Sequence, residues 1–298
     1  MCLWVILPNG KSLDKMEKEK IMQAVFLGAA CTSIILVALI CYCILAQGLP
    51  AVYQIGISDF FTGVKWRPSN DVYGILPMIL GSVYVTAGAL CIGVPIGILT
   101  AVFLARFCPA KLYSILKPSV ELLAGIPSVV YGFFGLMVLV PFVRDSIGGA
   151  GNSLLTAALL LGIMILPTII TVTEAALRAV PQSYYEGALA LGADHVRSVF
   201  YIVVPAARNG ILAAIILGIG RAVGETMAVM MVAGNQARMP QGLLEGGRTL
   251  TTNIVIEMGY AADLHRDALL ATAAVLFIFI LLINLSFTYF KEKAVNNG

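Results

Sequence analysis

The chain has 298 residues, of which 59% are hydrophobic and only 12% are charged, and its mean hydropathy is +0.93. Soluble domains carry roughly a quarter charged residues, so this composition excludes an ordinary water-soluble globule and predicts an integral membrane protein. The formal net charge of +3 reflects an excess of Lys and Arg in the loops of one side and does not indicate a nucleic-acid surface.

Six apolar stretches are each long enough to cross a bilayer as a helix. Runs of about 18 or more apolar residues with few charges are typical of membrane-spanning helices, since a rise of about 1.5 Å per residue carries them across about 30 Å of hydrocarbon. Pro95, Pro127 and Pro167 lie inside three of the stretches and each frees a backbone carbonyl, so kinks are expected there. In chain order the stretches are Ile21–Ala46, Ile75–Leu104, Val120–Val143, Leu154–Leu177, Gly210–Ala233 and Ala268–Phe290.

The Lys and Arg residues of the loops predict the orientation. Twelve of the 19 fall on the side of the N-terminus, six fall on the opposite side, and Arg221 lies within a span. Because cytoplasmic loops carry the excess of Lys and Arg, both termini are expected to be cytoplasmic. We predict a cytoplasmic segment 1–20 and one six-helix domain over 21–298, with its core at 75–290. The sequence MEKEK from Met16 is typical of a natural start, so residues 1–15 are hypothesised to be dispensable.

The sequence does not predict a metal site, a disulfide framework or an enzyme active site. Four of the six cysteines lie in spans and two on the inner side, and no pair has metal-ligand spacing, so neither a disulfide framework nor a metal site is predicted. No Gly-x-x-x-x-Gly-Lys-Ser/Thr motif is present to hold a nucleotide phosphate, and no nucleophile–base constellation favours an enzyme. No cofactor is expected. The two longer outer loops, 47–74 and 235–267, have room for partial helices or for contact with an external partner.

The third span combines a proline with several glycines. Pro127 and the nearby Gly132 and Gly135 predict an irregular or closely packed helix, for which packing is as good an explanation as a mobile gate. Tyr131 either lines a path or finds a hydrogen-bond partner within the bundle, as membrane tyrosines commonly do. Glu121, at the inner end of this span, is interpreted as an interfacial carboxylate rather than a gate.

The cytoplasmic segment 178–209 is different in kind. Pro181 suits the first turn of a helix, Gly192 offers a left-handed stop, Asp194 caps a second helix and Pro205 ends it. Both helices have apolar positions at helical spacing with no domain of their own to bury them, so this surface is expected to meet another protein; an interfacial helix lying against lipid is the alternative. The apolar positions are Tyr184, Ala188 and Leu191 in the first helix and Val196, Val199, Phe200 and Val203 in the second.

This segment resembles the docking loop of the membrane subunits of ABC importers. The signature of that family is Glu-Ala-Ala, three residues, Gly, nine residues, then Ile-x-Leu-Pro. Every spacing matches, with a glycine for one alanine and a valine for the leucine. In that family the loop docks into a groove on an ATPase subunit, which is what the resemblance implies for this chain. The matching residues are Glu186, Gly187, Ala188, Gly192, Ile202, Val204 and Pro205.

Three further segments resemble the phosphate-importer permease of the PstC type: Asn70–Ser82, Glu121–Leu136 and Gly220–Val229. The sister permease of such an importer shares part of this pattern. The resemblance implies an all-α, type I ABC importer permease (MetI-like) fold, a second homologous permease as partner, two ATPase subunits and an extracytoplasmic phosphate-binding protein. The missing nucleotide motif agrees, because the energy would come from a separate chain.

Two other functions stay open at this point. The first is a permease for another oxyanion, such as sulfate or molybdate. The second is an ion-coupled secondary transporter or channel that needs no ATPase.

The fifth span carries two charges, Arg221 and Glu225. A charge at the bilayer centre costs about 2.5–3.5 kcal/mol even on the lenient insertion scale, and a spacing of four places both residues on one helix face. Gly220 and Gly224 have the spacing that lets a neighbouring helix approach. The pair either locks helix packing against the partner permease or lines the translocation path, where an arginine binds oxyanions in two places at once.

Overall fold

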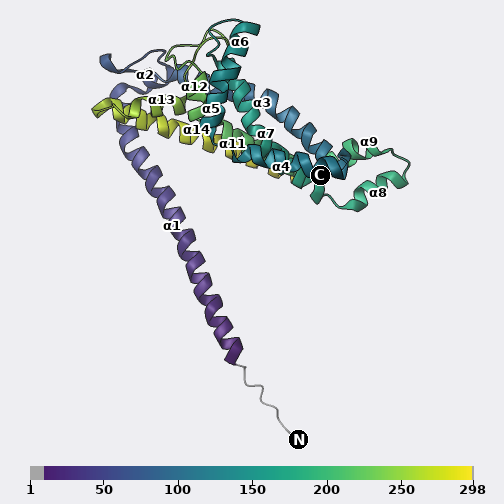
Figure 1. Ribbon diagram of the computed structural model, residues 1–298. Helices are drawn as coiled ribbons and strands as arrows, with labels where there is room; N and C mark the ends of the chain where they lie inside the picture. The colour runs from purple at the N-terminus through teal and green to yellow at the C-terminus, as the bar shows by residue number, and fades with distance from the viewer. Residues whose placement is uncertain (1–9, 297–298) are drawn as a thin grey trace.

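The computed structural model describes the backbone of residues 10–296 and the side chains of residues 19–286. Within these residues the chain is helical apart from loops and one two-stranded hairpin, so the expected all-α class is confirmed. Figure 1 shows a bundle from which α1 (Gly10–Ile55) extends far to one side. Residues 1–9 of the segment hypothesised to be dispensable lie outside the described residues.

Short helical pieces connect the long helices. Three of them, η2, η3 and η4, are single π-helical turns, which insert one extra residue into a helix. The elements after α1 are α2 (Ile57–Thr62), β1 (Trp66–Arg67), η1 (Pro68–Asn70), β2 (Val72–Tyr73), α3 (Leu76–Val102), η2 (Phe103–Phe107), α4 (Ala110–Gly125), α5 (Ser128–Phe134), η3 (Gly135–Leu139), α6 (Val140–Ser146), α7 (Leu154–Ala179), α8 (Gln182–Ala190), α9 (His195–Ser198), η4 (Val199–Val203), α10 (Val204–Ala206), α11 (Arg208–Gly224), α12 (Met227–Val232), α13 (Leu250–Met258) and α14 (Asp263–Asn296).

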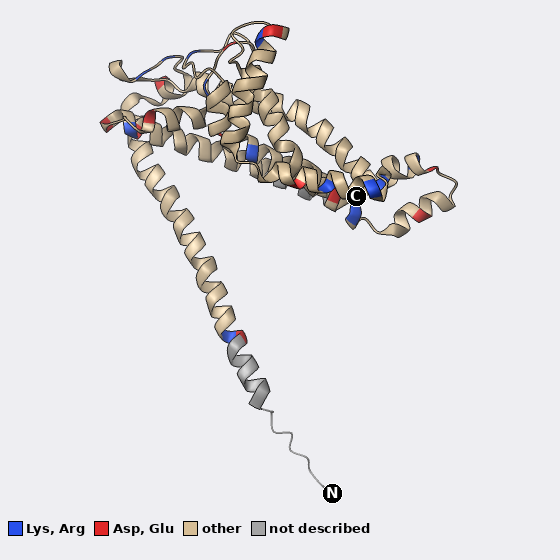
Figure 2. Cartoon of the chain, in the orientation of Figure 1, with Lys and Arg blue, Asp and Glu red and all other residues tan. Residues whose placement is uncertain are grey.

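Several helices are long and apolar enough to cross a membrane, so the expected multi-pass membrane protein is confirmed. A sixth candidate is reached only if His195–Ala206 and Arg208–Gly224, which are bent by 68° relative to each other, are taken as one span. Charged residues gather at the two ends of the bundle and are sparse along the helices between them (Figure 2). The five unambiguous segments within the described residues are Glu19–Ile55, Leu76–Phe107, Ser128–Ser146, Leu154–Ala179 and Asp263–Ser286.

The expected third span, Val120–Val143, is wrong as a single helix. The chain breaks between α4 and α5, where Ile126 has an extended ψ of 127°. Pro127 causes the break, because its ring disfavours helical geometry at the preceding residue and it has no N–H to donate. The expected irregularity at this proline is therefore confirmed, but in the form of two separate helices.

The expected fifth span, Gly210–Ala233, is also broken. Helix α11 ends at Gly224, and Glu225 has an extended ψ of 129° before α12 begins at Met227. By contrast, α3 and α7 run through Pro95 and Pro167 without a helix break. Hydropathy thus identifies both segments as apolar, but it does not show that each is divided into two helices.

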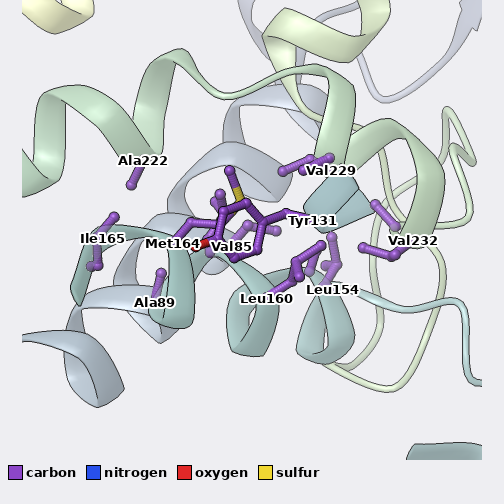
Figure 3. Packing of buried hydrophobic residues seen from close by; sticks show 14 of the residues in the cluster. Val85, Ala89, Tyr131, Leu154, Leu160, Met164, Ile165, Ala222, Val229 and Val232 are labelled. Atoms are coloured by element: carbon purple, nitrogen blue, oxygen red, sulfur yellow. The ribbon is translucent and has the colours of Figure 1, made fainter. Parts of the chain in front are cut away.

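Helix α7 is the most buried of the membrane-crossing segments and packs along α3. Small residues let the two helices approach closely: a Cβ atom on Gly93 would lie 2.9 Å from the carbonyl oxygen of Gly162, and one on Gly97 would lie 2.7 Å from the side chain of Ile169. Side chains from α3, α5, α7, α11 and α12 form the central core around Tyr131 (Figure 3). This core holds both broken segments against continuous helices.

The bundle has two structurally different ends. The hairpin end contains α2, β1, β2 and α13, packed on the start of α14 around Trp66 and Leu269, so the partial helices expected in the two longer loops are confirmed. The loop end contains α4, η2, the end of α7 and the segment 178–209, with Leu104, Leu177 and Val199 in its core.

Gly81 is expected to be intolerant of a side chain. A Cβ atom at this position would lie 2.3 Å from the carbonyl oxygen of Arg248, whereas one on Gly28 would meet nothing within 4 Å. Gly81→Ala should destabilise the protein by about 1–3 kcal/mol through overpacking, and Gly28→Ala, a change in an open helix position, should not. The midpoints of thermal unfolding of the two purified variants in detergent test this. Equal midpoints would contradict the close packing of α3 against the backbone of Arg248.

Candidate functional site

The break between α11 and α12 separates the two charges expected to pair. Glu225 follows the last residue of α11 and caps the next helix, because its Oε1 accepts a hydrogen bond of 3.1 Å from the backbone N–H of Ala228. Arg221 lies in the last turn of α11 and donates to Thr168 Oγ1 of α7 at 3.2 Å. The expectation that both share one face of one helix is therefore wrong, since the helix ends between them.

Tyr131 sits beside this break, in the central core. Its ring is buried among residues such as Val85, Leu160 and Met164 (Figure 3), in a core that also contains Ala222, the residue after Arg221. The hydroxyl donates to the carbonyl oxygen of Leu123 at 2.8 Å, across the break between α4 and α5. The structure thus places Tyr131 in the same core as the chain neighbour of Arg221 and also gives it the internal partner that a membrane tyrosine needs.

A polar strip that the sequence did not reveal lies against Glu225. Thr251 Oγ1 donates to the backbone oxygen of Glu225 at 3.1 Å, and Ser82 Oγ accepts from the N–H of Leu250 at 2.9 Å. These groups and Thr249 surround a cavity of about 10 Å³, the size of roughly one water molecule. Helix α13 begins with a capping box, in which the side chains of Thr249 and Thr252 accept hydrogen bonds from each other's backbone N–H groups. The usual sequence signature has Glu or Gln at the second position, so the two threonines gave only a weak signal.

One face of α11, which carries Gly220 and Gly224, has no neighbouring element in the described part of the chain. A Cβ atom on either Gly220 or Gly224 would have no atom within 4 Å, and both glycines are exposed. The face is therefore open to a neighbouring helix, as the spacing of the two glycines predicts.

The segment 178–209 folds as two short helices joined by the expected turn. Gly192 has φ +88°, the left-handed conformation that favours glycine, and the Oδ1 of Asp194 accepts from the N–H of Arg197 at 2.6 Å. Both expectations are confirmed. Pro181 directly precedes α8, but Pro205 does not end the second helix, because helical structure continues to Ala206.

The signature residues take different positions in this segment. Glu186, Gly187 and Gly192 are exposed on α8 and the turn, and Ile202 and Pro205 are exposed on the second helix. Ala188, on the inner side of α8, is buried, and Val204 is partly buried. Five of the six residues expected to contact the partner are thus accessible: Glu186, Gly187, Gly192, Ile202 and Pro205.

The apolar face expected on the second helix is split. Val199 and Val203 are buried in the core of the loop end, whereas Val196 and Phe200 are exposed. The π-helical turn η4 explains the split, because its extra residue rotates successive side chains away from α-helical register. Leu191 has 91% of its surface exposed, so an apolar docking surface does remain.

At the loop end, Glu174 forms an ionic cluster that the sequence did not predict. Its side chain, 3% exposed, accepts from Tyr113 Oη at 2.8 Å, Arg178 Nε at 2.8 Å and Lys117 Nζ at 2.9 Å. The hydrogen bond to Glu174, followed by burial, raises the pKa of Tyr113. Burial lowers the pKa of Lys117, but its hydrogen bond and attraction to Glu174 outweigh this and leave that pKa raised. Glu121 is also 3.6 Å from Lys117 but is 59% exposed.

At the hairpin end, Glu257 forms a second such cluster. It accepts from Trp66 Nε1 at 2.6 Å, lies 2.8 Å from His265 Nε2, and is ion-paired with Arg248. Burial, together with a hydrogen bond to Asp71, raises the pKa of the adjacent Tyr73 to about 12. This cluster fastens the hairpin to α13 and α14. No group of three or more His, Cys, Asp or Glu residues in the described part of the chain could hold a metal ion.

Residues 93–294 match the family model described as "Binding-protein-dependent transport system inner membrane component". Among curated relatives, the chain is 40% identical to the probable ABC transporter permease protein YqgH of Bacillus subtilis, over 92% of this chain and 91% of the relative. It is 34% identical to the phosphate transport system permease protein PstC of Mesorhizobium japonicum, over 89% of this chain and 87% of that one.

A solved structure has the same fold. A chain of the MetNI methionine ABC transporter in an inward-facing conformation matches with a TM-score of 0.59 and 21% identity, over 77% of this chain and 99% of that chain. The expected importer-permease fold is confirmed by this likeness.

The ion pair of Glu257 should matter far more for stability than that of Glu121. Glu257→Gln removes the charge that compensates Arg248, whose side chain is only 13% exposed, and breaking a buried pair costs about 3–5 kcal/mol. Glu121→Gln breaks an exposed pair worth at most about 1 kcal/mol. Thermal denaturation of both purified variants measures the difference; similar midpoints would show that Glu257 is not an anchor of the hairpin end.

Proposed function

The chain belongs to the inner membrane components of binding-protein-dependent transport systems, the permease subunits of ABC importers, and we propose that the substrate of its importer is inorganic phosphate. As a permease it is a transport subunit and not an enzyme. The observation that carries the proposal is the cationic Arg221 beside a helix break in the membrane-embedded core. The likeness to PstC permeases supports phosphate as the anion.

Arg221 is suited to meet a passing oxyanion. A guanidinium has five N–H donors, and within the described part of the chain Arg221 donates only to Thr168. The remaining donors are available to phosphate, which the planar fork of arginine binds in two places. Glu225 limits the strength of this attraction because its carboxylate lies one residue beyond the same helix, and conduction requires the ion to leave as well as enter.

The segment 178–209 is the proposed contact with the ATPase subunit. Glu186 and the exposed apolar side chains of Leu191 and Ile202 share this surface. Apolar residues exposed on short helices outside the membrane favour a protein partner over water. In this arrangement the loop end faces the cytoplasm, both termini are cytoplasmic, and ATP is hydrolysed on two partner chains.

At the opposite end, the hairpin would face an extracytoplasmic phosphate-binding protein. The bare face of α11 with Gly220 and Gly224 would receive a second homologous permease, which completes the path. A permease for sulfate or molybdate remains the alternative within the same class, because Arg221 would attract those oxyanions as well.

Reversing the charge of Glu186 should weaken attachment of the ATPase. Glu186→Lys presents a cation where the partner accommodates a carboxylate, and copurifying ATPase should fall about tenfold, the equivalent of about 1.4 kcal/mol. The control is Asp145→Lys, a similar charge reversal at an exposed position of α6, outside the segment 178–209. Affinity purification followed by quantification of the ATPase measures both. An ion-coupled transporter would be indicated instead if no ATPase copurified with the unaltered chain.

Replacing Arg221 should abolish most transport without preventing assembly. Arg221→Gln removes a charged donor whose hydrogen bonds are worth about 1.5–3 kcal/mol, so phosphate uptake into proteoliposomes should fall at least about tenfold. Arg144→Gln, at a position 55% exposed, serves as the control. Normal assembly with normal uptake in Arg221→Gln would remove Arg221 from the path.

A further inference from the structure

Glu174 joins two helices that no other ion pair among the described residues connects. Two of its three donors, Tyr113 and Lys117, belong to α4, and the third, Arg178, belongs to α7 itself. The side chain of Glu174 is almost fully buried. A carboxylate in such a place is retained only when its partners are in position, so the relative placement of α4 and α7 is fixed by this residue.

The same cluster also holds η2, which continues α3. Arg178 Nη2 donates to the carbonyl oxygen of Leu104 at 3.1 Å, and Arg106 Nη2 donates to that of Leu177 at 2.7 Å. The guanidinium of Arg178 lies 4.7 Å from the ring centre of Tyr113, within the range of a cation–π contact. η2, α4 and α7 thus meet at one point.

Helix α7 connects this cluster directly to the segment 178–209, which we call the docking segment. Helix α7 ends at Ala179, and only Val180 and Pro181 separate it from α8. Leu177 and Val180 share a packed core with Val199 and Val203 of the second docking helix. Because a packed core is barely compressible, a displacement of the docking segment is transmitted to the end of α7.

Helix α4 connects the cluster to the candidate translocation path. Helix α4 ends at Gly125, and the Tyr131 hydroxyl donates to the carbonyl oxygen of Leu123 near that end. Tyr131 in turn packs in the same core as Ala222, which follows Arg221 in α11. A movement of α4 therefore displaces the carbonyl oxygen of Leu123, which is hydrogen-bonded to Tyr131 of the candidate path.

We propose that Glu174 is a positioning residue for transport, which links the docking segment to the break between α4 and α5 through Tyr113 and Lys117. This inference rests on the proposed function, because it presupposes an ATPase on the docking segment. The link makes α4 follow α7 during each cycle. Without this link, the partner subunit continues to hydrolyse ATP, but the opening of the path is no longer coupled to hydrolysis.

The test removes the α4 side of the link and leaves Glu174 itself partnered. The double variant Tyr113→Phe, Lys117→Met retains the ion pair between Glu174 and Arg178 within α7, so the protein should still fold. Lys111→Met removes an exposed charge from the same helix and is the matched control. Each variant is reconstituted with the complete importer in proteoliposomes, and substrate uptake and ATP hydrolysis are measured together.

The uptake per ATP hydrolysed should fall roughly 2- to 30-fold in the double variant, the range expected for substitutions along a coupling network. It should be unchanged in Lys111→Met and restored when Lys117→Arg replaces Lys117→Met in the double variant. An unchanged ratio in the double variant would overturn the proposal. If both activities fell in proportion, the ratio would also be unchanged, and the role of the cluster would be purely structural.

A failure of the proposed substrate is separable from a failure of the link. If the unaltered assembly takes up sulfate or molybdate in place of phosphate, the substrate assignment is wrong, and the ratio is then measured with that oxyanion. The link is supported or overturned by the same comparison in either case.

Discussion

A buried charge in this protein is tolerated only with partners, and this constraint organises both ends of the bundle. Glu174 at the loop end and Glu257 at the hairpin end each contact three polar side chains drawn from more than one element. Transfer of an unpaired carboxylate from water to an apolar interior costs several kcal/mol. Each carboxylate therefore fixes the elements that carry its partners, and the apolar helices between the two ends are held at both.

The helix breaks in the middle of the bundle obey the same rule for backbone groups. In lipid every freed N–H or C=O must be satisfied within the protein. At the first break, the Tyr131 hydroxyl donates to Leu123; at the second, Glu225 accepts from Ala228 and Thr251 donates to Glu225. Two of the three side chains that repair these breaks, Tyr131 and Glu225, are also residues proposed for the path, so irregular backbone and polar side chains occur together there.

The sequence predicted features that depend on local chemistry and missed those that depend on distant contacts. Apolar length located most membrane-crossing helices, and glycine and cap preferences placed the turn at Gly192 and Asp194. Helical spacing failed for Arg221 and Glu225, because it assumes a continuous helix. The sequence did not predict the Glu174 and Glu257 clusters, because the partners on other elements lie far away in the chain. Lys117 and Tyr113 are 57 and 61 residues from Glu174, and Trp66 is 191 residues from Glu257.

The arginines of the chain differ in how completely their donors are used, and this difference separates a structural role from an available one. Arg248 donates to Asn235, Asn253 and Glu257, and Arg178 binds Glu174, Leu104 and the ring of Tyr113. Arg221 lies in the membrane-embedded core with Thr168 as its one hydrogen-bond partner in the described part of the chain. An incompletely satisfied guanidinium is costly in such surroundings, and an anion that enters the path lowers that cost by supplying the missing acceptors. The same incomplete bonding that burdens the isolated chain thus supports the proposal that a passing oxyanion binds at this point.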